Sequence, residues 1–181
     1  MNRCLFVGLM VALLVFSGSA RNGYAQSVIT DEALASVATA ESAVADAKAA
    51  IKRGRDLVAL IPDDSPLLPE VGQMLKEVSM NWKIAIESIE GANQSAAKIA
   101  STKSEGLAKD YALLAKVNSS VAISGANVVQ IGMDYVEAVA TDKTEALDLI
   151  RGAMLNALAA SSQVKLNCDK VKSLISEKYS N

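Results

Sequence analysis

The chain contains no histidine, so the residue on which most catalytic and metal-binding motifs depend is absent. The Glu-x-x-His pairs of ferritin-like di-iron sites, the Cys-x-x-Cys-His haem motif and the Ser-His-Asp triad all require histidine. No carboxylate occupies the predicted helix seams, which argues against a metal site made of Asp and Glu alone. A Ser-Lys pair is compatible with the composition, but no sequence context supports one. The sequence therefore predicts a non-enzymatic protein with no catalytic, cofactor-binding or metal-binding residues.

Two cysteines are present, and the first, Cys4, lies in a segment that resembles a secretory signal peptide. This segment, Met1 to Ala25, has a basic start, an apolar run from Leu5 to Phe16 and a small-x-small cleavage site before Gln26. The apolar run is shorter than the ~20 residues that a membrane span needs. We therefore expect cleavage after residue 25, with a cut after Ala20 as the alternative, and export to the periplasm or the extracellular space. The short leader is typical of a bacterial protein.

Cleavage would leave Cys168 as the single cysteine, so no intramolecular disulfide could form. Cys168 lies on the apolar stripe of the last predicted helix, where a free cysteine is usually a small buried hydrophobe. The alternative is a free reactive thiol or an intermolecular disulfide, because an unpaired cysteine in a secreted protein can pair between chains. Burial is the favoured interpretation.

The charge of the predicted mature chain, residues 26–181, argues against nucleic acid as a partner. Sixteen Lys and Arg stand against twenty Asp and Glu, a net charge of −4, and no basic stripe is present. The densest basic patch runs from Lys48 to Arg55, with acidic residues nearby. A solvated helix face is the favoured interpretation of this patch, and the alternative is a site for an anionic ligand or a lipid headgroup.

Apolar and small residues repeat at helical spacing along the mature chain, and Val37, Val44, Ile51 and Val58 recur every seven residues. The composition is rich in alanine and valine and poor in aromatic residues, which favours closely packed helices over sheets. The sequence predicts a single domain, residues 26–181, with helices at about 30–61, 66–102, 103–140 and 142–178.

Punctuating residues mark the predicted turns. The three prolines lie between residues 62 and 69, and capping-box patterns begin at Thr102 and Asp142. Four helices of matched length with short connections predict an all-α fold, an elongated antiparallel up-down-up-down four-helix bundle with heptad-like, coiled-coil seams rich in alanine and valine.

Two side chains on these helices have alternative interpretations. Trp82 lies on the apolar stripe of the second helix, where a core anchor is favoured over a platform for a ligand. Asn118 lies beside the stripe of the third helix. It is either a buried polar residue that fixes the helix register or a residue that faces water.

Two stretches carry no charge, Val117 to Met133 in the third helix and Gly152 to Val164 in the fourth. A hairpin about Thr141 would place Gly125 and Leu158 at the same height, so that the stretches lie side by side. Because a bundle helix buries one stripe about 100° wide, two whole helix middles without charge suggest that part of their outer surface is covered as well. An uncharged but solvated surface is the alternative. The candidate interaction face consists of Val117, Gly125, Val129, Gly132, Leu155 and Leu158.

These features predict an exported helical bundle that acts by helix-mediated association, either with a second copy of itself or with an unknown protein partner. The third helix would be the most buried helix. The alternative is a bundle that opens and lays its apolar stripes on a membrane or on lipid. The polar helix faces lack the basic and aromatic residues that membrane-surface helices usually carry, so membrane contact is the less favoured alternative.

Overall fold

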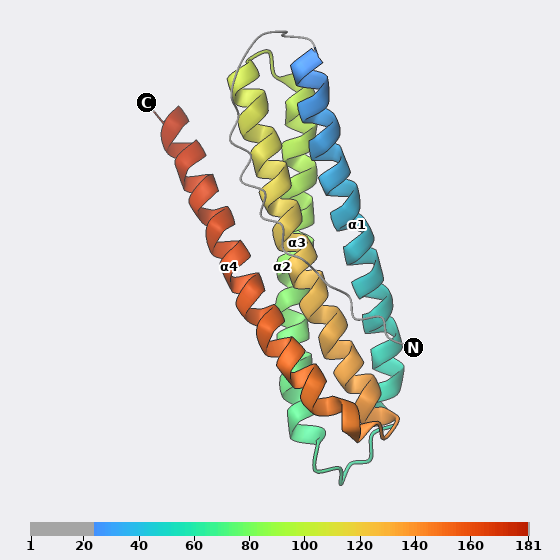
Figure 1. Cartoon of the computed structure of the whole chain (residues 1–181). Coiled ribbons are helices and arrows are strands. Elements are labelled where there is room, and N and C mark those ends of the chain that lie inside the picture. Colours follow the sequence, from blue (N-terminus) through green and yellow to red (C-terminus); the bar gives the residue numbers. More distant parts are fainter. Residues whose placement is uncertain (1–23, 181) are drawn as a thin grey trace.

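The computed structural model describes residues 24–180, in which four long α-helices, one short 3-10 helix and no strand occur. The predicted antiparallel four-helix bundle is confirmed, because consecutive long helices run in opposite directions (Figure 1). Of the predicted leader, residues 1–23 lie outside the described part of the chain. The elements are α1 (Tyr24–Val58), α2 (Leu68–Ser101), α3 (Glu105–Ala140), η1 (Thr144–Ala146) and α4 (Leu147–Tyr179).

The first connection is the loop that contains the three prolines. α1 begins at Tyr24, earlier than the predicted start at Thr30, and ends at Val58 just before this loop. α2 begins at Leu68, and Pro69 falls in its first turn, where a missing N–H leaves no helical hydrogen bond unmade. The prolines therefore place this turn close to where the sequence predicts it.

The turn between α2 and α3 also lies at the predicted place, but its capping residue differs. The hydroxyl of Ser104 accepts a hydrogen bond from the backbone N–H of Leu107 at 3.4 Å, as an N-cap does. Thr102, the predicted cap, is instead the extended residue that ends α2.

The prediction that Asp142 caps the start of the last helix is wrong. Asp142 adopts the left-handed conformation, with φ 57°, and closes α3 instead of starting α4. The N–H of Lys143 donates to the carbonyl of Ala138 at 2.8 Å, and the N–H of Asp142 donates to that of Val139 at 3.3 Å. These two bonds form a Schellman motif. The 3-10 helix η1 follows, so α4 begins five residues later than predicted.

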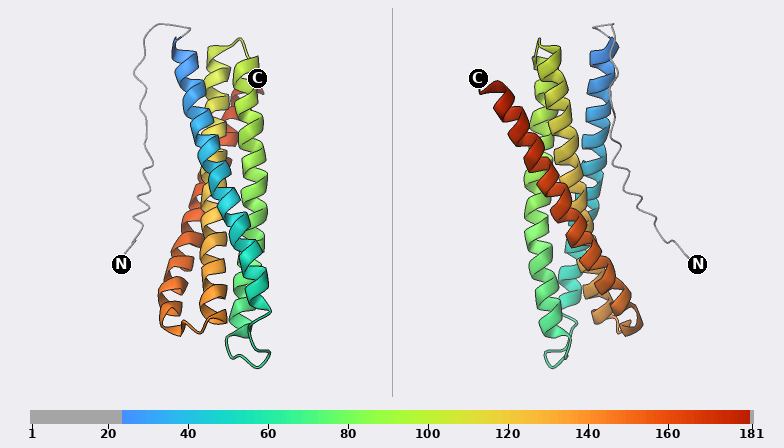
Figure 2. Two further views of the ribbon diagram at one scale, coloured as in Figure 1. Left: turned by 90° about the vertical axis from the view of Figure 1, so that its right-hand side faces the viewer. Right: turned by 60° about the vertical axis from the view of Figure 1, so that its left-hand side comes forward.

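α3 is the central helix and packs against α1, α2 and α4. α1 and α2 also contact each other, although less extensively, whereas the backbone of α4 comes close to α3 and η1 alone among the described elements. α4 crosses the other helices obliquely, and its C-terminal end diverges from them (Figure 1 and Figure 2). The segment Val117 to Met133 forms the middle of α3, which has more buried residues than any other helix, as the sequence predicts.

The core differs in composition between the two ends of the bundle. Near the α3–α4 turn it contains valines and the fully buried Tyr135. Near the α2–α3 turn it is mostly alanine, and small side chains allow the helices to approach closely there. The alanines of this second part include Ala33, Ala40, Ala92, Ala108 and Ala115.

Candidate functional site

The predicted interaction face does not form one exposed surface. Gly125, Val129 and Gly132 are buried within the chain's own core, so the part of the face on α3 is covered by the neighbouring helices. The other three residues are Val117 and Leu158, which are partly buried, and Leu155, which is 69% exposed. Most of the uncharged middle of α3 is therefore covered by α1, α2 and α4 of the same molecule, whereas Ser120 and Asn127 are exposed.

The two glycines of this set bring α2 close to α3. A Cβ atom added to Gly125 would lie 2.9 Å from the backbone oxygen of Asn81 and 3.2 Å from the Cβ of Ala85. A Cβ atom added to Gly132 would overlap the side chain of Val78. The small residues that the sequence assigns to a partner helix therefore serve packing within the bundle.

α4 is held on α3 by a narrow contact. Its buried residues, Leu147, Met154, Ser161 and Cys168, occur once in seven positions. Met154 lies against Gly132, and the Cys168 thiol donates to the Asn118 Oδ1 at 3.5 Å. These two contacts are fourteen residues apart on both helices.

The register between α3 and α4 follows from those contacts. It places Gly125 level with Ser161, three residues from the predicted partner Leu158, because α4 starts after η1. The Ser161 hydroxyl crosses to α2 and donates to the Asn81 Oδ1 at 3.3 Å. A second polar contact therefore joins α4 to the rest of the bundle at this height.

The outward side of α4 carries a stripe of small and apolar residues at a 3-4-3-4 spacing. We call Gly152, Leu155, Ala159, Ser162 and Leu166 the outer α4 stripe; all five are exposed. Leu155 and Leu166 expose 69% and 51% of their surface, and a Cβ atom added to Gly152 would meet nothing within 4 Å. The spacing is that of a helix seam, so α4 presents a second apolar stripe away from α3.

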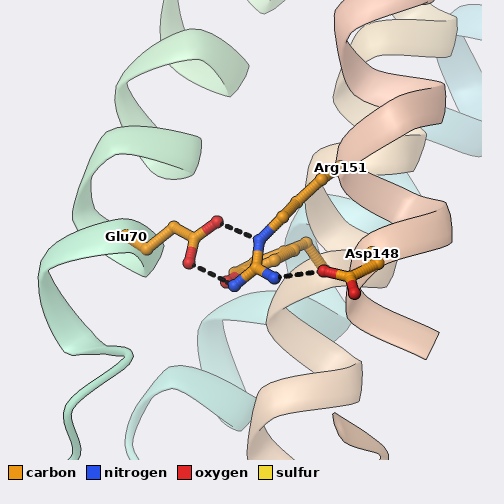
Figure 3. A network of polar contacts seen from close by, with 4 residues as sticks. Glu70, Asp148 and Arg151 are labelled. Carbon is orange, nitrogen blue, oxygen red and sulfur yellow. Dashed lines mark hydrogen bonds and ion pairs between the residues drawn. The ribbon is translucent and has the colours of Figure 1, made fainter. Parts of the chain in front are cut away.

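A polar network, which the sequence did not predict, fixes the start of α4 (Figure 3). Arg151 donates from Nε and Nη2 to the two carboxylate oxygens of Glu70 on α2, both at 2.6 Å. Its Nη1 donates to Asp148 at 2.7 Å, and its Nη2 lies 3.4 Å from the hydroxyl of the buried Tyr135 on α3. The network therefore joins α2, α3 and α4 in one place.

The pKa values in this network follow from its geometry. The hydrogen bonds from Arg151 lower the pKa of the Glu70 carboxyl, although partial burial opposes the change. Burial raises the pKa of Tyr135 to about 12, and the hydrogen bond with Glu70 adds to the rise. Both shifts keep the charges of the Arg151–Glu70 pair and the proton of Tyr135 in place near neutral pH.

The far end of α4 is attached by exposed side chains. Lys178 and Tyr179 both donate to the Oδ2 of Asp110 on α3, each at 2.6 Å. This attachment spans the region where the helix ribbons diverge. α4 is therefore tied at both ends by polar contacts and in the middle by its single buried stripe.

The structure distinguishes the alternatives at Asn118 and Cys168. Asn118 is 3% exposed and is the buried polar residue of the two interpretations. Cys168 is 2% exposed, and burial raises the pKa of its thiol. Both side chains therefore lie in the α3–α4 interface, away from solvent.

Metal and membrane features are few in residues 24–180. These residues contain no group of three or more His, Cys, Asp or Glu that could hold a metal ion. α3 is long and apolar enough to cross a membrane by length and composition, and 56% of its most apolar window is buried inside the bundle. The core helix of a water-soluble bundle meets the same criteria of length and composition. Comparisons of the chain with protein-family models, with curated proteins and with solved structures find no match.

Proposed function

We propose that this chain is an exported, non-enzymatic binding protein that associates with another helix along the outer α4 stripe. The associating helix is the same stripe of a second copy or a helix of a protein partner. The observation that supports this most directly is the seam-like spacing of Gly152, Leu155, Ala159, Ser162 and Leu166 on the exposed side of α4. A partner helix that covers these apolar side chains would remove their surface from water, and this burial favours association.

The dimensions of the stripe limit what can bind. Five residues over two heptads extend about 21 Å along the helix, at about 1.5 Å per residue. The small residues Gly152, Ala159 and Ser162 would let a partner backbone approach, while the two leucines would pack into its holes. Charged residues lie at both ends of the stripe, Arg151 beside Gly152 and Lys165 beside Leu166. So short a contact would give a reversible complex, not an obligate one.

Substitution of the two stripe leucines tests this proposal. Leu155→Lys combined with Leu166→Lys should abolish the concentration-dependent association of residues 26–181 in sedimentation velocity, because lysine places charge in the seam. Leu113→Lys is the matched control, since Leu113 is a leucine on α3 that is 44% exposed and lies outside the stripe. All variants should keep the helical circular dichroism of the unsubstituted chain.

The protein-partner form of the proposal needs a second measurement. A photo-crosslinking residue at Ala159 should capture a discrete adduct in the producing cell, and the Leu155→Lys and Leu166→Lys substitutions should remove it. A monomeric protein at high concentration that also gives no substitution-sensitive adduct would exclude both forms.

Export can be tested separately from association. The features of Met1 to Ala25 support a leader that is removed, so the protein recovered from the producing cell should begin at Gln26. Mass spectrometry of the intact protein measures this directly, and fractionation should place it outside the cytoplasm. Retention of residues 1–25 would contradict the proposal.

The alternative function is binding to a membrane or to lipid, and the apolar character of α3 favours it. It would require α3 to leave the core, since the helix is mostly covered by its three neighbours. Flotation with liposomes separates the two functions. A helix-binding protein should stay at the bottom of the gradient, and an opened bundle should float.

A further inference from the structure

A groove of about 350 Å³ lies between α1 and α2, on the side of the bundle that the proposed function does not use. Its walls are Ile51 and Val58 of α1 and Leu75, Val78 and Trp82 of α2, and its floor includes Met133 of α3. Small-molecule sites in proteins begin at about 300 Å³ and are lined mainly by apolar side chains. The groove meets both conditions.

The arrangement of the helices explains why a groove forms here. α1 and α2 both pack more extensively on α3 than on each other, so the space between them is filled less completely. Gly54 of α1 lies over the thioether of Met133, and Gly132 of α3 lies over the side chain of Val78. Each glycine leaves room for one side chain of the groove, Met133 on the floor and Val78 in the wall, and so fixes where that side chain lies.

The polar residues of the groove are Arg55 and Ser79, and no carboxylate lines it. Arg55 has no ion-pair or hydrogen-bond partner within the described residues 24–180. A guanidinium group at the edge of an apolar groove attracts an anion, and it can hold a carboxylate through two parallel hydrogen bonds.

Two further cations lie on the same face of α1. Lys52 and Lys48 precede Arg55 by one and two helical turns, and neither forms an ion pair within the described chain. Glu41, two turns before Lys48, accepts a hydrogen bond from Asn93 of α2 at 3.1 Å, which shows that this face of α1 is turned toward α2. The basic patch therefore borders the α1–α2 side of the bundle, and Glu41 on the same face of α1 offsets part of its charge.

We propose that the α1–α2 groove binds a single-chain amphiphile with a carboxylate head, such as a free medium-chain fatty acid. The alkyl chain would lie against Trp82, Val78 and Met133, and the carboxylate would pair with Arg55. Burial of each methylene group is favourable, so the chain supplies affinity and the head supplies orientation. The anionic-ligand interpretation of the Lys48–Arg55 patch and the ligand-platform interpretation of Trp82 then describe one site.

Trp82 provides the measurement, because it is the single tryptophan of the chain and it lines the groove. Dodecanoate, added at neutral pH below its micelle concentration, should change the Trp82 fluorescence in a saturable way, with matching heat in titration calorimetry. Dodecyltrimethylammonium, which has the same chain and a cationic head, should bind much more weakly.

Three variants separate the head from the chain. Arg55→Gln should weaken dodecanoate roughly tenfold or more, as expected for loss of hydrogen bonds to a charged group, and should leave dodecanol unchanged. Ser79→Phe should weaken both ligands, because the ring fills the groove. Arg53→Gln is the matched control, since Arg53 is an exposed arginine two residues away that does not line the groove.

Several results would overturn the proposal. These are no saturable response to dodecanoate, equal binding of dodecanoate by Arg55→Gln and by the unsubstituted chain, or equal affinity for the cationic amphiphile. Binding to phosphatidylglycerol vesicles without binding to monomeric dodecanoate would assign the site to a bilayer instead. Leu155→Lys should bind dodecanoate normally, so failure of this proposal and failure of the α4 association are separate observations.

Discussion

Arg151 of α4 and Glu70 of α2 form a two-point ion pair through their side chains. The backbones of α2 and α4 do not come close to each other. Because α4 buries one residue in seven, this pair adds a polar contact to the few apolar ones, Leu147 and Met154, that hold its first turns on the bundle. The pair lies at the end where α4 meets α3, and the buried Tyr135 hydroxyl lies beside it. It therefore contributes to how firmly the first half of α4 is held.

Glu70→Gln should loosen the first half of α4. Hydrogen exchange should rise across residues 147–158 and change little in α1, because the neutral amide cannot form the charged two-point pair. The free energy of unfolding of this variant should also depend less on pH in the acid range. The pKa of Glu70 is lowered in the fold by Arg151, so its stabilisation is present above about pH 5 and is lost as the pH falls through the lowered value.

The measurement is urea unfolding between pH 3 and pH 7. The stability gap between the unsubstituted chain and Glu70→Gln should be largest at neutral pH and should shrink in acid. Glu87→Gln is the control, because Glu87 forms an exposed pair with Lys83 at 3.8 Å within one helix. An exposed pair of this kind contributes little. A pH-independent gap would show that the Glu70 charge is not what stabilises α4.

Tyr135→Phe should make the protein less sensitive to alkali. Burial raises the pKa of Tyr135 to about 12, so the folded chain keeps a proton that the unfolded chain loses near pH 10. The stability contribution of Tyr135 is thus present below about pH 10 and is lost as the pH rises through about 12. The pKa values of Lys165 and Lys178 are raised by Asp169 and Asp110, so these lysines also stabilise the fold less as the pH rises. Their effect should be the same in the unsubstituted chain and in Tyr135→Phe.

Unfolding curves recorded from pH 8 to pH 12 should show a steeper fall for the unsubstituted chain than for Tyr135→Phe. At neutral pH the phenylalanine variant should lose about 1 kcal/mol, the usual value of one hydrogen bond. Tyr111→Phe, at a partly buried position on the same helix, should follow the unsubstituted chain. Parallel curves for all three proteins would contradict the assignment to Tyr135.

The fold could be predicted from the sequence because burial of charge is costly and periodicity is local. The absence of charge from Val117 to Met133 marked the central helix, and the prolines marked the first turn. The structure of the last turn could not be predicted in the same way. Asp142-x-x-Glu145 has the pattern of a helix start, yet Asp142 adopts the left-handed conformation that ends α3. The extra 3-10 turn then shifts α4 along α3.

The candidate sites depend on contacts between distant segments, which local patterns do not reveal. The spacing of Gly125 and Gly132 places small residues on a helix seam, but it does not say which helix they meet. Glu70 and Arg151 are 81 residues apart and belong to no motif. The groove beside Trp82 lies between α1 and α2, which both pack more extensively on α3 than on each other. Of the predicted interaction face, Leu155 alone became part of the outer α4 stripe.

Gly125→Val should destabilise the bundle by about 1–3 kcal/mol, the usual cost of overpacking a core. The added carbon atoms would meet the backbone oxygen of Asn81, which cannot move aside as a side chain can. Gly72→Ala is the matched control, because a Cβ atom there meets nothing within 4 Å. It should stabilise α2 by up to about 1 kcal/mol through helix propensity. Denaturant unfolding compares the two, and equal effects would contradict the close α2–α3 approach.

Cys168 should react slowly with thiol reagents in the folded protein and rapidly after unfolding. It is buried against Asn118, and burial raises the pKa of its thiol, so reactive thiolate is scarce. Ser173→Cys is the control, because it adds an exposed thiol on the same helix that should react at once. Size in solution should be the same with and without reductant. Because the buried residues of α4 are spaced seven apart, the helix should separate from α3 from time to time and expose Cys168. The rate of the Cys168 reaction should then measure how often this separation occurs. Glu70→Gln should raise that rate. Equal rates at both thiols would mean that α4 is not docked in solution.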